Sequence, residues 1–255
     1  MSEAMTWRGA PTSRWTADET VVLAFGAHPD DVEGFAGGTV AKLALHGARV
    51  HVCVATGGEA GIPGEPAHAV SARRLLEAEA ASKVLGAASF TALRLQDGLV
   101  RNTVDLQLAV VRVARRVGAN LLLTHSPADP HPDHANLAVA VREARMVCEL
   151  GGVGDGEPLP TAPDLVHWDP QHGLGPVPDF WVDVTDTMEV RRAALACHES
   201  QLALPDGRSL IEITDVLARL RGIQAGVPYA EGLYRPEETT RPAAGLDRLI
   251  RLLAA

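Results

Sequence analysis

The sequence predicts an α/β fold in which helices cover both faces of a mostly parallel sheet. Short apolar runs alternate with helical stretches, most of the predicted helices stop at a glycine, and chemistry-bearing residues follow several of the apolar runs. A chain of 255 residues can bury a large core, and its apolar content shows no obvious break. We therefore expect a lead-in over residues 1–20 and a single domain over residues 21–255.

The first elements form a strand–helix–strand unit. Residues 21–25 are a short apolar run after polar residues and predict a buried strand, and residues 26–31 predict a loop. Residues 35–46 have a helical pattern that stops at Gly47, and residues 49–55 are rich in valine. These stretches predict one βαβ unit.

The alternation continues along the chain. The remaining predicted elements are helices over 69–85, 104–117, 187–197 and 211–224, and strands over 90–93, 120–124, 165–168 and 180–184. Ligands bind beyond the carboxyl ends of parallel strands, so the loops after residues 25, 55, 93 and 124 should line one crevice. Residues 151–163, rich in glycine and proline, predict a mobile surface loop and a candidate lid.

Composition excludes several classes of protein. The net charge is -9 and no lysine or arginine patch stands out, which argues against a nucleic-acid partner. Cys53, Cys148 and Cys197 are far apart, so they predict neither a disulfide framework nor a thiolate zinc site. The chain shows no signal-peptide run and no membrane-spanning run. We expect a cytoplasmic protein without a membrane partner; a homo-oligomer is compatible with the sequence.

Two loops carry candidate metal ligands. The first contains His28, Asp30 and Asp31, and a turn can bring positions 28 and 31 onto one side. The second, over residues 129–134, delivers His131 and His134 to the same crevice. Two histidines and one carboxylate leave a coordination position open for water, as in catalytic zinc sites. Asp30 could then take a proton from water, and His131 could stabilise an oxyanion.

Ordinary structural roles compete with these functional ones. The His-Pro-Asp-Asp stretch at 28–31 could be a solvated turn, and Asp133 is favoured as a cap of the following helix. His125 is favoured as a satisfied histidine at a strand end. Asp129 could cap the helix or orient His131.

The two loops resemble those of the LmbE-like family, which includes the GlcNAc-phosphatidylinositol de-N-acetylases (PIG-L). Its two signatures are similar to residues 27–31 and 129–134, and the resemblance covers roughly residues 21–235. Further similar segments are residues 56–61, Arg74 with Glu77, residues 97–98, residues 194–201 and residues 229–231. Val32 departs from the pattern, because many relatives carry Glu there, although Glu33 follows.

The resemblance implies a Rossmann-like three-layer sandwich and a zinc-dependent N-deacetylase. It implies that His28, Asp31 and His134 bind zinc, that Asp30 is the general base and that His131 stabilises the oxyanion.

The resemblance also implies substrate contacts at Arg74, Asp97 and His198. Arg74 and Glu77 could equally form a surface ion pair, and His198 could cap a helix end.

The expected substrate is a small N-acetylated amino sugar, which would be hydrolysed to a free amine and acetate. A larger thiol-conjugate or natural-product amide is the alternative substrate, and Fe²⁺ is the alternative metal. A non-catalytic sugar- or nucleotide-binding module would need no metal, and the chain has no Gly-x-Gly-x-x-Gly or P-loop after the first strand. A non-haem iron oxygenase would place His and Asp with one residue between them, whereas His28 and Asp31 are separated by two.

Overall fold

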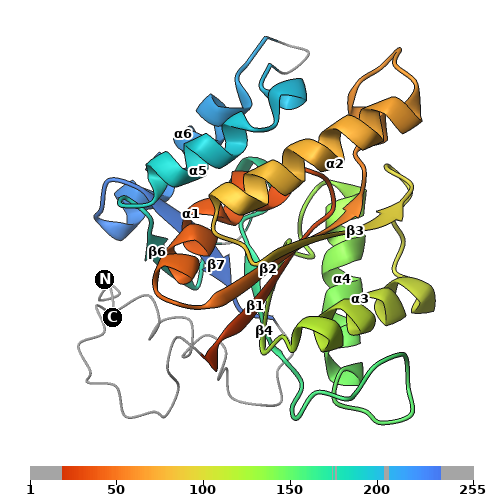
Figure 1. Cartoon of the computed structure of the whole chain (residues 1–255). Coiled ribbons are helices and arrows are strands. Elements are labelled where there is room, and N and C mark those ends of the chain that lie inside the picture. Colours follow the sequence, from red (N-terminus) through yellow and green to blue (C-terminus); the bar gives the residue numbers. More distant parts are fainter. Residues whose placement is uncertain (1–18, 174, 176, 204–206, 237–255) are drawn as a thin grey trace.

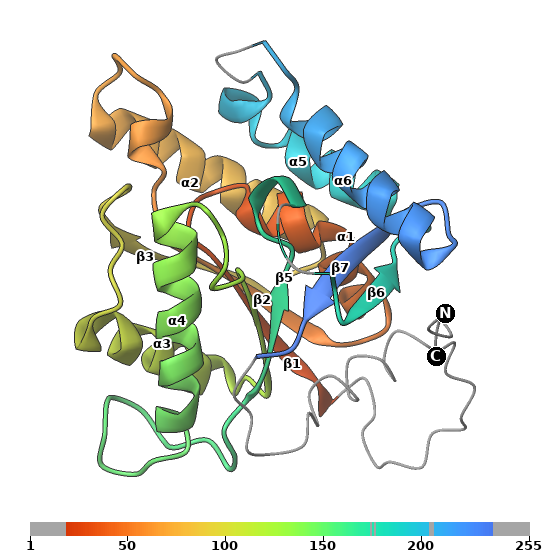
Figure 2. The same ribbon diagram turned by 180° about the vertical axis from the view of Figure 1, so that it is seen from behind.

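The protein is a three-layer α/β sandwich built on a seven-stranded sheet, as Figures 1 and 2 show. The computed structural model describes residues 19–236, apart from 174, 176 and 204–206. The predicted ends of the chain therefore lie largely outside the described residues. The strands are β1 (Val21–Gly26), β2 (Arg49–Thr56), β3 (Ser89–Leu95), β4 (Leu121–Thr124), β5 (Asp164–Trp168), β6 (Phe180–Asp183) and β7 (Ala230–Tyr234). The α-helices are α1 (Asp31–Leu45), α2 (Ala67–Val84), α3 (Val104–Val117), α4 (Pro132–Val147), α5 (Met188–Ala196) and α6 (Leu210–Ala225).

The strand order is β3-β2-β1-β4-β5-β7-β6. Strands β1 to β5 pair in parallel, and β7 pairs antiparallel with both β5 and β6. The order reverses at β1, because β2 and β3 extend the sheet to one side whereas β4 lies on the other. The carboxyl ends of β1 and β4 therefore flank a topological switch point, where open α/β sheets bind their ligands.

Two hydrophobic clusters fill the two faces of the sheet. Alternate residues of β1 point to opposite sides: Val22 and Ala24 join one cluster, and Leu23 and Phe25 join the other. Helices α1, α2, α5 and α6 cover the first face, and α3 and α4 cover the second (Figures 1 and 2). This burial on both faces explains why the first strand is a continuous apolar run in the sequence.

The first helix begins earlier than the sequence indicates. α1 starts at Asp31 rather than near residue 35, and its first turn, including Val32 and Glu33, is buried. The residue before it, Asp30, has a φ of 102°, which a residue with a side chain adopts only under strain. This sharp entry turn brings the loop after β1 and the first turn of the helix together at the switch point.

Two further expectations are wrong. Residues 230–234 form β7, a buried strand between β5 and β6, where no strand was predicted from the sequence. The loop over residues 151–163 is no lid, since it precedes β5 and so lies at the amino-terminal edge of the parallel strands, opposite the switch point. Arg115 of α3 donates hydrogen bonds to the carbonyl oxygens of Val153, Asp155 and Gly156, which fasten this loop to the body of the protein.

Within the described residues, no helix is both long and apolar enough to cross a lipid bilayer.

Candidate metal centre and active site

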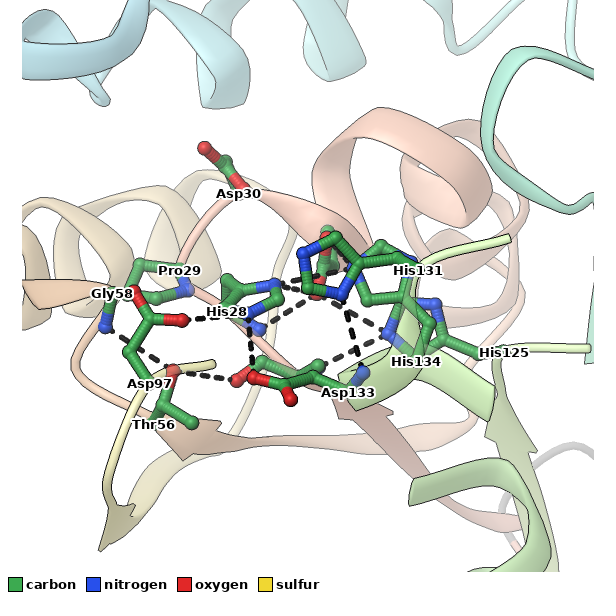
Figure 3. A network of polar contacts seen from close by, with 12 residues as sticks. His28, Pro29, Asp30, Thr56, Gly58, Asp97, His125, His131, Asp133 and His134 are labelled. Carbon is green, nitrogen blue, oxygen red and sulfur yellow. Dashed lines mark hydrogen bonds and ion pairs between the residues drawn. The ribbon is translucent and has the colours of Figure 1, made fainter. Parts of the chain in front are cut away.

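The loops after β1 and β4 meet at the switch point, as predicted. Figure 3 shows the side chains of His28, His125, His131 and His134 gathered at this place, with those of Asp97 and Asp133 beside them. His28 comes from the loop after β1, and His134 lies in the first turn of α4. Chain segments a hundred residues apart therefore contribute to one cluster.

His28, Asp31 and His134, here called the candidate triad, present ligand atoms to one point. His28 Nδ1 lies 3.2 Å from His134 Nε2 and 3.4 Å from Asp31 Oδ2. Asp31 Oδ1 lies 3.4 Å from His134 Nε2. Ligand atoms about 2.1 Å from a tetrahedral ion lie about 3.4 Å from one another. The pairwise distances match this spacing, with Asp31 presenting Oδ2 to His28 and Oδ1 to His134.

Electrostatics support an ion at this point. Burial would raise the pKa of Asp31, but the neighbouring His134 and His125 hold it well below its usual value. Burial would lower the pKa of His28, yet hydrogen bonds to Asp133, Asp31 and Asp97 raise it well above its usual value. Without a metal, this buried cluster attracts protons, and a cation at the same place would satisfy the same carboxylates.

Asp97 and Asp133 orient His28 through its other ring nitrogen. His28 Nε2 lies 3.0 Å from Asp97 Oδ1 and 3.3 Å from Asp133 Oδ2. A proton on Nε2 leaves the lone pair of Nδ1 directed at the candidate triad. Asp133 also accepts hydrogen bonds from the amides of Gly98 and Val100. Asp133 is therefore no helix cap, contrary to the favoured structural interpretation.

Asp129 contacts His134 rather than the ring of His131. Its Oδ1 lies 3.2 Å from His134 Nδ1 and accepts a hydrogen bond from the backbone amide of His131. Its Oδ2 accepts from the amide of Gln171. Burial would lower the pKa of His134, but Asp31 and Asp129 raise it. Both histidines of the candidate triad thus have a carboxylate at the nitrogen that faces away from the ion.

His131 caps α4 and faces the candidate triad. Its Nδ1 accepts a hydrogen bond from the amide of Asp133, so the neutral ring carries its proton on Nε2. The ring stacks on His134 with centroids 4.5 Å apart and meets the edge of His28 at 4.9 Å. Burial and the neighbouring His134 and His28 lower the pKa of His131. At neutral pH it can therefore offer an N–H group.

Asp30 lies beside the candidate triad but points away from it. Figure 3 shows its carboxylate directed away from His28. Its Oδ2 lies 3.1 Å from an Arg74 nitrogen. Burial raises the pKa of Asp30, and the charge of Arg74 partly offsets this.

Arg74 is buried and bonded to the protein. Its side chain is 4% exposed and donates hydrogen bonds to the carbonyl oxygens of Gly58 and Pro29 as well as to Asp30. It forms no surface ion pair with Glu77, which instead accepts hydrogen bonds from Ser200. The guanidinium joins the loops after β1 and β2 and supports the strained turn at Asp30.

His198 is fully buried next to Glu33. Its Nε2 lies 3.5 Å from Glu33 Oε2. Burial would lower the pKa of His198, but Glu33 and the nearby Asp30 raise it. The buried pair thus lies close enough to Asp30 for the charges to interact.

Three overlapping groups within the described residues have the spacing to hold an ion. They are His28 with His131 and His134, Asp31 with His125 and His134, and His28 with Asp97 and Asp133. The members of the candidate triad are shared between the first two groups and do not form a group of their own. His125 was favoured as a purely structural residue, and it is indeed fully buried and satisfied. However, its Nε2 lies 3.2 Å from Asp31 Oδ2. Burial and the neighbouring His134 lower its pKa to about 4. Its position directly after β4 is the signal by which it could have been recognised.

The fold and the site define an α/β protein with a candidate metal centre at its switch point. The model of the family described as GlcNAc-PI de-N-acetylase (PIG-L) matches residues 23–145. The 4-oxalmesaconate hydratase of Pseudomonas putida is 31% identical over 231 residues, which cover 83% of this chain and 87% of that protein. The chain therefore belongs to the LmbE-like (PIG-L) family.

Two deacetylases are also similar to this chain. The diacetylchitobiose deacetylase of Thermococcus kodakarensis is 29% identical over 228 residues, covering 85% of this chain and 83% of that protein. The crystal structure of the N,N'-diacetylchitobiose deacetylase from Pyrococcus horikoshii with its inhibitor has a TM-score of 0.74 at 25% identity. The match covers 84% of this chain and 82% of that one. The predicted fold is thereby confirmed.

Proposed function

We propose that the protein is a cytoplasmic, zinc-dependent N-deacetylase of a small N-acetylated amino sugar. The observation that carries the proposal is the candidate triad, whose ligand atoms lie 3.2 to 3.4 Å apart. His28 through Nδ1, His134 through Nε2 and the carboxylate of Asp31 would hold the ion. The proposed compartment agrees with Cys53 and Cys148, which are buried and not joined in a disulfide.

A bound zinc ion would polarise an acyl oxygen and lower the pKa of water at the open position. Asp30 would accept the proton of the attacking water and later deliver it to the leaving amine. Its raised pKa suits this exchange, because a group that titrates nearer neutral pH can both accept and release a proton. This role requires the Asp30 carboxylate to turn from Arg74 toward the candidate triad.

His131 would stabilise the oxyanion with its Nε2–H group. The amide of Asp133 occupies Nδ1, so the proton of the neutral ring is on the nitrogen that can reach a substrate. Asp97 contacts His28 through Oδ1 and the amide of Ala60 through Oδ2, and its remaining lone pairs would accept from sugar hydroxyl groups. Arg74 is buried and its two terminal nitrogens donate to protein oxygens, so it would act by supporting the loop of Asp30 rather than by direct contact with substrate.

A hydratase is the second candidate, favoured by the 31% identity to the 4-oxalmesaconate hydratase. The charges of this site favour the deacetylase. Asp30, Asp97, Asp129 and Asp133 surround the candidate triad, and the nearby Arg74 is bonded to protein oxygens. A multiply charged organic acid would meet like charges here, whereas a neutral acetamide would not.

The test is incubation of purified, zinc-loaded protein with N-acetylglucosamine, N,N'-diacetylchitobiose and larger amides, with free amine and acetate as the products measured. We expect equal amounts of amine and acetate from an N-acetyl sugar, and none from the His28→Ala variant. Metal analysis of protein purified without added metal distinguishes zinc from iron. Hydration of an unsaturated organic acid with no amine release from any amide would contradict the proposal.

A further inference from the structure

His125 lies beneath the candidate triad and is fully buried. Its ring stacks on His134, with centroids 3.9 Å apart and an angle of 24° between the planes. The indole Nε1 of Trp168, at the end of β5, lies 3.3 Å from His125 Nδ1. On the other side of the ring, Nε2 faces Asp31 Oδ2 at 3.2 Å and the amide of Ala27 at 3.0 Å.

These contacts determine which ring nitrogen carries the proton. The indole N–H of Trp168 can only donate, so it needs the lone pair of Nδ1. With the proton on Nε2, the ring accepts from Trp168 and donates to the Asp31 carboxylate, while the Ala27 amide faces that N–H without an acceptor. With the proton on Nδ1, the ring accepts from Ala27 alone, sets its N–H against the indole N–H and turns a lone pair toward the Asp31 carboxylate. The Nε2–H form therefore satisfies two partners, one of them a buried carboxylate, whereas the Nδ1–H form satisfies one.

The same contacts exclude His125 as a metal ligand, although its spacing to Asp31 and His134 would allow it. In the Nε2–H form, Nε2 has no lone pair to give. In the alternative form, that lone pair accepts the Ala27 amide. In neither form is a lone pair directed at an ion.

The contacts of His125 also give the two oxygens of the Asp31 carboxylate different roles. Asp31 Oδ2 accepts the backbone N–H of His28 at 2.6 Å, faces His125 Nε2 and lies 3.4 Å from His28 Nδ1. Asp31 Oδ1, 3.4 Å from His134 Nε2, keeps its lone pairs for the ion. With both donors on Oδ2, the carboxylate is held in a one-oxygen binding orientation.

We propose that His125 is a positioning residue, locked by Trp168 in the Nε2–H form, that holds Asp31 so that only Oδ1 binds the metal. The inference rests on the metal site proposed above. Partners of this kind typically change metal affinity by about 10- to 100-fold when they are removed. Trp168 would thus control metal affinity although it touches none of the ligands directly.

The first experiment reads the proton position in the metal-free, full-length protein labelled with ¹⁵N-histidine. Two-bond proton–nitrogen correlation spectra distinguish a protonated ring nitrogen from an unprotonated one, and the His125→Asn variant identifies the signal. We expect His125 to carry its proton on Nε2. A proton on Nδ1 would overturn the inference, whatever the activity of the enzyme proves to be.

The second experiment measures zinc affinity by chelator competition. Trp168→Phe keeps a large aromatic ring but removes the N–H donor, and we expect the dissociation constant for zinc to rise about 10- to 100-fold. The matched control is Trp181→Phe, which removes the indole contact to Gln224 remote from the site and should leave zinc affinity unchanged. Equal affinities in the two variants would overturn the inference. Wild-type protein that binds no zinc would overturn the proposed function as well.

Discussion

Two buried polar clusters of this protein differ in how their charges are balanced. Directly after β5, Asp169 accepts two hydrogen bonds from Arg221, at 2.9 and 2.6 Å, and one from Tyr234 at 2.6 Å. We call these three residues the Asp169 network. At the switch point, the carboxylate of Asp31 instead faces His28, His125 and His134. Asp97 and Asp133 also contact His28, through its other ring nitrogen.

The difference teaches which cluster is structural. In the Asp169 network, Arg221 is a permanent cation. Its bidentate contact satisfies both oxygens of the Asp169 carboxylate, which leaves little for a ligand to bind. In the candidate triad, the only positive charge that the facing groups can supply is a proton on histidine, and imidazoles with lone pairs aimed at a carboxylate suit a divalent ion. An excess of buried acceptors over fixed cations therefore marks the site. Each prediction below tests one side of this comparison.

The largest effect is expected from Asp30→Asn. Asparagine tolerates the positive φ of this position, so the turn should persist while the proton-accepting group is lost. We expect kcat to fall about 10²- to 10⁴-fold, with zinc content unchanged by metal analysis. Full turnover in a correctly folded, zinc-loaded variant would remove Asp30 from the mechanism.

The second prediction concerns the Asp169 network. Arg221→Met leaves the buried Asp169 without its cation and should lower the free energy of unfolding by about 3 to 5 kcal/mol, measured by denaturant titration. Arg112→Met is the matched control, because its partner Asp155 is exposed and the expected loss is at most about 1 kcal/mol. Zinc affinity of both folded variants should equal that of the wild type. A specific loss of zinc binding in Arg221→Met would contradict the purely structural role of the Asp169 network.

A smaller effect is expected from Asp133→Asn. The change weakens the partner that keeps the proton of His28 on Nε2, so zinc affinity should fall about 10- to 100-fold, measured by chelator competition. Asp155→Asn, on the loop at the opposite edge of the sheet, is the control and should bind zinc normally. If both variants bind zinc equally well, Asp133 does not orient His28.

The smallest effect is the dependence of zinc affinity on pH. The pKa values of His28 and His134 are raised in the metal-free protein, so zinc must displace protons from these rings. Affinity should therefore fall as the pH is lowered through the raised pKa values, by up to about tenfold per pH unit for each proton released. Calorimetry in buffers of different ionisation enthalpy measures the released protons. Binding that is independent of pH and releases no protons would contradict this ligand set.

The sequence predicted best those elements whose ends are determined by neighbouring residues in the chain. The helix over residues 104–117 was predicted with its observed bounds, because Thr103 caps its start and Gly118 ends it with a φ of 70°. The loops after β1 and β4 were expected at one crevice because the carboxyl ends of parallel strands share an edge. β7 escaped prediction, since its place between β5 and β6 depends on pairing with strands far away in the sequence.

The same distinction applies to the site. The residues of the candidate triad stand in two short motifs, so their convergence was predictable. The partners of Asp133 and His125 were not, because an aspartate in the first turn of a helix and a histidine at a strand end have ordinary structural uses. Only the packing shows that Asp133 reaches His28 at 3.3 Å and that Trp168 reaches His125 at 3.3 Å. The partners of the buried Arg74 likewise come from two separate loops, those after β1 and β2.

The most direct test of the account is an anomalous-scattering measurement at the zinc edge on crystals of the zinc-loaded protein. The account predicts one strong peak about 2.0 to 2.2 Å from His28 Nδ1, His134 Nε2 and Asp31 Oδ1. A peak bound instead between Asp97 and Asp133, or no peak in a crystal where the candidate triad keeps its geometry, would contradict it.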